Sequence, residues 1–328
     1  MAASAAAVAL SACGVFDVDS GSVTSMVGAF RADQAPLGQY FSFDRYAAGA
    51  DVDLDGPKNK VLDEVFVQRS ADPTVSRPLA QALASPAIER PVIGVSSVDA
   101  TYEQPGTSGA TLLRGEFDVD QVTKRLEAAL RQQRDKMVGA EGASEPPNVG
   151  PPQREGAFTR LTVEGFAFES DVDRDTSLAV SEDTMVLLPS AVPTSQVLVE
   201  DRNKSRLRSK AVREVAAVLD DAEVYAAVLS FEAVTFEGGE PALAGGFGTG
   251  LVDGGERSFT VLAHDSDRAV TANIAALKSL MGNETGCDGP VEVTVKGRVA
   301  VASCRSDGAT WGAQVLDGLD ASGPFTAP

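Results

Sequence analysis

The sequence predicts an α+β protein made of two related units, each a mainly antiparallel sheet with helices packed on one face. The chain has 328 residues, which suggests about two domains, and 43% of them are hydrophobic, enough for packed cores. Short alternating apolar runs, typical of strands, stand between segments with apolar residues at helical spacing. The order strand, Asp-containing turn, helix and hairpin occurs near residues 110–168 and again near residues 258–303, which indicates a duplicated unit.

Residues 1–12 are predicted to be a signal peptide. An Ala-rich apolar stretch precedes Leu10–Cys13 (Leu-Ser-Ala-Cys), and it is too short for a bilayer span, which needs about 20 apolar residues. Leu-Ser-Ala-Cys resembles the lipobox of bacterial lipoproteins, in which the peptide is cleaved before the cysteine and the cysteine is acylated. The resemblance implies that Cys13 is a palmitate-type lipid anchor on the extracytoplasmic face of the cell membrane. No Lys or Arg precedes Cys13, which departs from the usual positively charged start.

Residues 13–90 are predicted to be a lipid-anchored tether and a poorly defined segment. Within them, residues 51–56 (Asp-Val-Asp-Leu-Asp-Gly) match the start of an EF-hand calcium loop. The twelfth position, which should be Glu, is Leu62, so an acidic solvated turn is favoured over an EF-hand. A calcium site of another kind stays open at Asp51, Asp53 and Asp55.

The first α+β unit is predicted over residues 91–236. A strand at residues 110–114 leads to a helix that Asp118 caps, with Gln121 three residues later and an apolar face that includes Val122 and Leu126. A Pro- and Gly-rich surface insertion follows at residues 139–156. The later elements are hairpins at 159–168 and 177–188, a helix at about 205–219 and a strand at 223–230.

The second α+β unit is predicted over residues 237–328, and it opens with a Gly-rich connection at 237–256. Gly245–Gly250 lacks the Lys of a P-loop and does not open a helix, so a flexible connection is favoured over a phosphate site. A strand at 258–263 precedes a helix capped by Asp267, and a hairpin pairs residues 291–295 with 299–303.

The cysteines support an exported protein. If Cys13 is acylated, Cys287 and Cys304 remain as a pair, which in an exported protein is most simply a disulfide. They flank the predicted hairpin, whose ends lie together, and closing a loop of about 17 residues contributes about 3 kcal/mol. Two buried free thiols or a redox-active pair are the alternatives.

Three segments carry a resemblance to a protein family: residues 112–122, 162–166 and 178–187. The first holds Arg-Gly-Glu-Phe-Asp-Val-Asp-Gln-Val, a turn into a helix, and the third holds a Leu-Ala-Val hairpin. Together they resemble uncharacterised exported proteins and lipoproteins of actinobacteria, over residues 95–305. The resemblance implies a compartment and a fold, and it supplies no activity.

The composition excludes several classes of function. There are 47 Asp and Glu against 28 Lys and Arg, so the net charge of −19 disfavours nucleic acid. His264 is the only histidine, no Gly-x-Ser-x-Gly motif accompanies it, and a surface or capping role is expected. Trp311 is expected to be a packing anchor, and the basic run from Arg202 to Arg213 a solvated helix face.

The most consistent interpretation is therefore a non-enzymatic binding or assembly module of the cell envelope. It is anchored in the membrane through lipid and takes an envelope protein or a cell-wall polymer as its partner, without cofactor, metal or nucleic acid. A second interpretation is an envelope hydrolase or transferase that uses two carboxylates on a cell-wall polymer. A third is a calcium-responsive protein acting through Asp51, Asp53 and Asp55.

Overall fold

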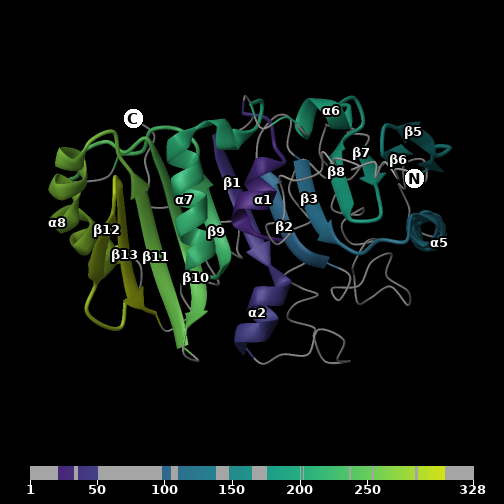
Figure 1. Ribbon diagram of the computed structural model, residues 1–328. Helices are drawn as coiled ribbons and strands as arrows, with labels where there is room; N and C mark the ends of the chain where they lie inside the picture. Colours follow the sequence, from purple (N-terminus) through teal and green to yellow (C-terminus); the bar gives the residue numbers. More distant parts are fainter. Residues whose placement is uncertain are drawn as a thin grey trace, which may run out of the picture.

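The structure is a computed structural model, and its elements are drawn in Figure 1. It describes residues 21–32, 36–50, 98–104, 110–137, 148–164, 176–199, 201, 203–235, 238–252, 255–284 and 287–306. Cys13, the Asp51–Gly56 motif, Phe166–Phe168 and Trp311 lie outside these residues, as does most of the predicted insertion. Within them, thirteen strands form one antiparallel sheet, which confirms the α+β class.

The sheet runs without a break from one edge of the described structure to the other. Its order is β12 (Glu292–Lys296), β13 (Val299–Arg305), β11 (Gly255–Ala263), β10 (Ala244–Val252), β9 (Val224–Ser230), β1 (Leu37–Ser42), β2 (Val98–Gln104), β3 (Ala110–Gly115), β8 (Thr184–Pro189), β7 (Thr176–Val180), β6 (Phe158–Glu164) and β4 (Asn148–Val149), with β5 (Gln153–Glu155) also on β6.

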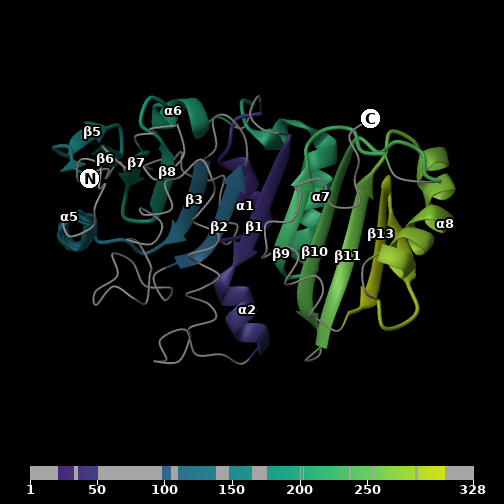
Figure 2. The same cartoon turned by 180° about the vertical axis from the view of Figure 1, so that it is seen from behind.

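Helices lie on both faces of this sheet, where one covered face was predicted. The first face, the α7 face, carries α1 (Val23–Gly28), α6 (Thr194–Val197), the short 3-10 helix Arg206–Arg208 and α7 (Lys210–Asp221). The opposite face, the α8 face, carries α2 (Phe43–Ala50), α5 (Val119–Met137) and α8 (Asp267–Glu284). Figure 1 shows α1 and α7 in front of the strands, and Figure 2 shows the same strands from behind. Each strand alternates its side chains between the two faces. Buried apolar residues occupy both sets of positions, so there is one apolar cluster on each face.

The strand order contains the same arrangement twice. The meander β1-β2-β3, followed by α5 and the hairpin β7–β8, has the same order as β9-β10-β11, α8 and the hairpin β12–β13. In both halves the last strand of the hairpin returns to pair with the third strand of the meander. The halves meet where β1 pairs antiparallel with β9, so their strands continue one sheet.

The segment predicted as a tether supplies the central strand. β1 pairs with β2 on one side and β9 on the other, and its Tyr40 and Phe41 are buried on opposite faces. Helix α1 is held against α7, because Asp220 accepts hydrogen bonds from the N–H groups of Val23 (2.8 Å) and Thr24 (2.9 Å). Residues 21–50 are therefore part of the packed body.

The prediction of a flexible connection at residues 237–256 was wrong, because residues 244–252 form β10 inside the sheet. Two of its glycines face α7. A Cβ at Gly246 would lie 2.8 Å from Val215 Cγ1, and one at Gly248 would lie 3.0 Å from Leu219 Cδ2. The glycines let helix α7 approach the strand closely. Glycine is otherwise depleted in strands, which is why the segment resembles a linker.

Most other predicted elements are confirmed. Helix α5 begins after Asp118, whose carboxylate accepts from the Gln121 N–H at 2.9 Å, and Phe117 and Val122 are buried in one cluster. The hairpin at 177–188 is β7–β8 and the one at 291–303 is β12–β13. The predicted helix at 205–219 begins as a 3-10 turn and continues as α7.

Candidate functional site

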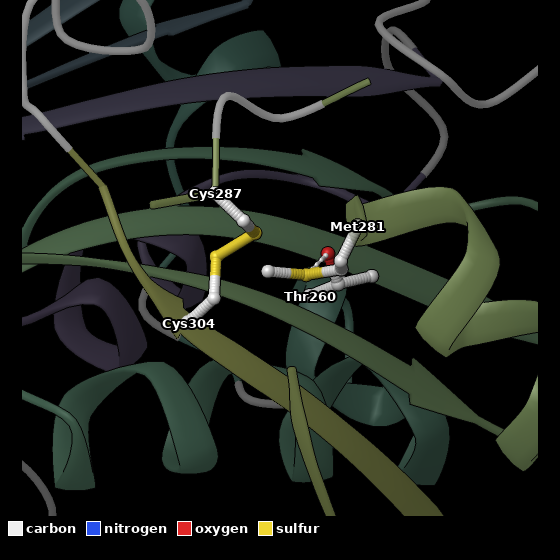
Figure 3. The surroundings of a disulfide bond; sticks show 4 residues. All are labelled: Thr260, Met281, Cys287 and Cys304. Carbon is white, nitrogen blue, oxygen red and sulfur yellow. Dashed lines mark hydrogen bonds between the residues drawn. A yellow bond between two sulfur atoms is a disulfide. The ribbon is translucent and has the colours of Figure 1, made fainter. Parts of the chain in front are cut away.

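The predicted disulfide is present. Cys287 and Cys304 are bonded, with their Cα atoms 5.7 Å apart (Figure 3). Cys304 belongs to β13 and is fully buried, whereas Cys287 follows α8 and is half-buried. Two backbone contacts join the same two segments. They are an isolated antiparallel β-bridge between Cys287 and Ser306 and a hydrogen bond from Asp288 N to Arg305 O (2.9 Å). The bond therefore fixes the chain leaving α8 to the sheet.

A second contact holds α8 beside the disulfide. The Thr260 hydroxyl on β11 lies 2.8 Å from Met281 Sδ on α8, and it donates to the sulfur. Figure 3 shows Thr260 and Met281 next to the disulfide. Both side chains are fully buried, so the polar atom of Thr260 has a partner inside the α8 face.

Nearby, polar side chains lie in the interior of the α8 face without such partners. Thr249 of β10 stands directly opposite Ser258 of β11, and they are 0% and 2% exposed. Ser258 in turn stands opposite Cys304. In the next row of the same face, the Ser306 N–H donates to the Glu256 carbonyl at 3.1 Å, which places Ser306 beside Glu256. These four polar residues form one patch at the β10–β11–β13 end of the sheet.

Four oxygen atoms of this patch are buried and have no hydrogen-bond partner in the described part of the chain. They are Thr249 Oγ1, Glu256 Oε2, Ser258 Oγ and Ser306 Oγ, and we call them the oxygen cluster. Leaving a buried polar group without a partner costs about 1–3 kcal/mol, and native proteins pair nearly all such groups. Other unpartnered buried polar atoms are scattered over the described structure, and these four lie together.

Tyr225 borders the oxygen cluster on β9. The β9–β10 register shifts between Thr249 and Gly250, so Tyr225 is an extra residue and turns toward the α8 face. Its hydroxyl donates to Glu256 Oε1. Burial, reinforced by the Glu256 carboxylate, raises the pKa of Tyr225 far above the ordinary value, so the phenol stays protonated. The rings of Tyr46 and Phe41 pack edge-on against it at 5.1 and 5.8 Å.

The side-chain hydrogen bond of Glu256 is to a phenol rather than to a cation. The Tyr225 hydroxyl contacts one carboxylate oxygen, and no ion pair joins Glu256 to another residue within the described ranges. Arg257, the next residue, pairs with Glu292 at 2.7 Å. The site thus offers one carboxylate, three hydroxyls and aromatic rings. The set contains no soft metal ligand.

His264 is buried, at 3% exposure, where a surface or capping position was predicted. Its two ring nitrogens lie 3.5 and 3.4 Å from Asn273 Nδ2 on α8. Asn273 also exchanges two hydrogen bonds with the Glu240 backbone, donating to its carbonyl (2.8 Å) and accepting from its N–H (2.6 Å). Burial lowers the pKa of His264, which a hydrogen bond to Pro241 partly opposes. The residue connects the loop before β10 to α8.

The described part of the basic run contains both packed and exposed side chains. Arg206 is buried, with its guanidinium 4.3 Å from the Phe231 ring centre, and Arg213 donates to the Leu207 carbonyl at 3.0 Å. Lys210 pairs with Glu214 at 3.5 Å. Two of the basic side chains are thus used in packing within the chain.

An open depression of about 630 Å³ lies at the start of α5. Its lining is acidic apart from two apolar residues: Glu116, Phe117, Asp118, Val119, Asp120 and Glu182. Asp118 is already engaged as the helix cap, and hydrogen bonds to Gln121 lower its pKa. In the described part of the chain no group of three or more His, Cys, Asp or Glu is arranged to hold a metal.

Sequence reasoning missed the oxygen cluster. Its residues come from β10 and β11 and from the position just after β13, and no motif marks them, although Ser258 and Thr249 occupy strand positions that face the interior. Of the helices in the described ranges, none is long and apolar enough to span a bilayer.

No family model and no curated protein matches the chain. Among solved structures, the one described as "Structure of crystal form I of TP0453" matches with a TM-score of 0.41 and 8% sequence identity. The match covers 92% of this chain and 98% of that chain, and at this TM-score it carries no argument about function.

Proposed function

We propose that the protein is a lipid-anchored protein of the cell envelope that binds a ligand on the extracytoplasmic side without catalysing a reaction. The disulfide is the observation that supports a location outside the cytosol. Such bonds persist in oxidising compartments and are rare in the reducing cytosol. The bond uses Cys287 and Cys304 and leaves Cys13, in its lipobox-like sequence, as the third cysteine.

The binding role rests on the oxygen cluster. Unpartnered hydroxyl and carboxylate oxygens at Thr249, Ser258 and Glu256 are hydrogen-bonding capacity that a ligand would reach only after the side chains covering them move apart. Thr249, Glu256 and Ser258 belong to regular strands, which hold their backbone in place. The proposed role requires only reversible hydrogen bonding to a ligand, without a chemical reaction.

The compartment is tested by expressing the full chain in its native host and measuring its intact mass in membrane and soluble fractions. We expect a mature chain that begins at acylated Cys13 and sediments with membranes. The Cys13→Ala variant should lose acylation and leave the membrane fraction. The matched control, Cys287→Ser with Cys304→Ser, should keep its lipid and its membrane location.

Thiol alkylation before and after reduction gives an independent readout of the compartment. Two alkylated cysteines should be found only after reduction if the disulfide forms in the host. A wild-type chain that stays unprocessed in the soluble fraction, with both thiols alkylated without reductant, would overturn the proposal.

A further inference from the structure

We infer that β12 is an interface through which two copies of this chain pair edge to edge, forming a two-fold dimer with one continuous sheet. Such pairing goes beyond the binding role proposed above and does not depend on it. β12 is the last strand at its end of the sheet (Figure 1). In the described part of the chain it pairs with β13 on one side and with no strand on the other.

The two edges of the sheet differ. At the opposite edge, the outermost strands β4 and β5 are only two and three residues long, and very short edge strands protect natural proteins from pairing. β12 has five residues, Glu292–Lys296, contains no proline, and pairs with β13 without a bulge. It therefore has the length of a common strand and lacks these forms of protection.

The outward backbone groups of β12 belong to Val293 and Val295. The turn between β12 and β13 has two residues, so the residues that flank it, Lys296 and Val299, exchange hydrogen bonds. Hydrogen-bonded and non-hydrogen-bonded residues alternate along an antiparallel pair. The N–H and C=O groups of Val293 and Val295 therefore point away from β13, toward the open edge, where a second strand can pair with them.

The sequence of β12 complements itself when a second copy runs antiparallel to it. With Thr294 opposite its own copy, Val293 lies opposite Val295 of the second copy. In the same register Glu292 lies opposite Lys296 of the second copy. The two-fold axis repeats each pair, so the strands exchange four backbone hydrogen bonds and two Glu–Lys contacts. Within β12 this register brings no like charges together.

The charges of β12 favour a second copy over a protective role. A lone lysine on an edge strand repels its own copy and so keeps two edges apart. Glu292 and Lys296 have opposite signs and stand equally far from Thr294. Within the chain, Glu292 already pairs with Arg257 at 2.7 Å and Lys296 with Asp221 at 3.2 Å. Pairing of two copies would join these ion pairs into a row of alternating charge.

Val295 gives the second copy an apolar contact. It is 46% exposed, one of two large apolar side chains that are exposed in the described part of the chain. It stands opposite Ala300 of β13, which belongs to the apolar cluster of the α8 face. In the dimer it would lie opposite Val293 of the second copy, which packs against the same cluster in its own chain. The contact would extend the apolar cluster from one chain into the other.

Helix α8 leaves room for this arrangement. It lies on the α8 face chiefly over β13, one strand in from the edge. Strands in a sheet are about 4.8 Å apart, so three spacings, about 14 Å, would separate β13 from its copy. Packed helices need an interaxial distance of about 8–10 Å. The α8 helices of two copies can therefore lie side by side on one face.

The experiment uses the full chain carrying Cys13→Ala, which removes lipid and a free thiol as causes of association. Sedimentation equilibrium measures the oligomeric state up to submillimolar concentration. We expect a weak, reversible dimer, because five residues a side bury less than the roughly 800 Å² per partner of a standard interface. A monomer at every concentration, or an association that continues beyond the dimer, would overturn the inference.

Charge reversal tests the register. Glu292→Lys and Lys296→Glu each place two like-charged pairs across the interface and should weaken dimerisation about tenfold. An equimolar mixture of the two variants restores both opposite pairs and should dimerise as the parent chain does. Glu214→Lys, on α7, makes the same change of charge as Glu292→Lys away from the edge and should leave dimerisation unchanged. Equal dimerisation by all samples would place the interface elsewhere and overturn the inference.

Cysteine crosslinking tests the position of the two-fold axis. Thr294 would face its own copy as a non-hydrogen-bonded pair with Cα atoms about 4.5 Å apart, within the range of a disulfide. Thr294→Cys should therefore form a covalent dimer on oxidation. Glu292→Cys should not crosslink with itself, because its two copies would stand about 14 Å apart, but it should crosslink with Lys296→Cys. Self-crosslinking of Glu292→Cys as fast as that of Thr294→Cys would contradict the register and overturn the inference.

Discussion

The two faces of β10 and its neighbours are built differently. On the α7 face, Gly246 and Gly248 let α7 approach until a single added Cβ would lie 2.8 Å from its neighbour. On the α8 face, the same strand carries Thr249 with a hydroxyl that has no partner. At this strand the first face is packed closely against a helix, and the second holds a buried hydroxyl without a partner. The same strand is thus limited by steric contact on one face and by an unmet hydrogen bond on the other.

The largest expected effect tests what holds the α8 face together. Replacing Cys287 and Cys304 by Ser removes a loop constraint of 17 residues and should lower the free energy of unfolding by about 3 kcal/mol. Chemical denaturation with and without reductant measures it. Hydrogen exchange should show faster opening in α8 than in α7. Equal acceleration in both helices would contradict the difference between the faces.

The next effect tests the close packing on the α7 face. Gly246→Val places side-chain atoms against Val215 and Leu219 and should lower the free energy of unfolding by about 2 kcal/mol. Gly282→Ala, in α8 with nothing within 4 Å of the added Cβ, is the control and should be neutral or stabilising. The denaturation midpoint of each variant is compared with that of the parent chain. An unchanged midpoint for Gly246→Val would show that α7 can move away from β10.

The pH dependence of stability tests the contact between α8 and the loop before β10. Burial lowers the pKa of His264 in the folded state, so the unfolded chain binds more protons below about pH 6.5. The stability that neutral His264 contributes is therefore present above that pH and is lost as pH falls. In His264→Gln, the melting temperature should fall less steeply between pH 7 and pH 5 than it does in the parent chain. A decline of the same slope in the variant would assign it to carboxylates elsewhere.

The smallest effect sharpens the comparison between the faces. Thr249→Val exchanges an unpartnered hydroxyl for a methyl group of the same shape and should stabilise the ligand-free protein by at most about 1 kcal/mol. Equilibrium denaturation of matched samples measures this. A loss of stability would place the hydroxyl among the groups that hold the fold.

Local features were predictable because neighbouring residues determine them. Asp118 and Gln121 lie three residues apart, so the cap of α5 could be identified without knowing the rest of the chain. The same is true of the β12–β13 hairpin, where Gly297 has a φ of +61° in the two-residue turn. The pairing of Cys287 with Cys304 followed from that hairpin, because its ends lie together.

Only the tertiary structure decided β10, β1 and the oxygen cluster. Whether a glycine-rich segment is a linker or a strand depends on what packs against it, and here that is α7, some 30 residues earlier in the chain. The central place of β1 depends on pairing with β2 and β9, which lie far away in sequence. The oxygen cluster exists because strand register places Thr249 opposite Ser258 and Ser306 beside Glu256. Amino-acid spacing specifies short-range hydrogen bonds, whereas burial and missing partners arise only when distant strands are brought together.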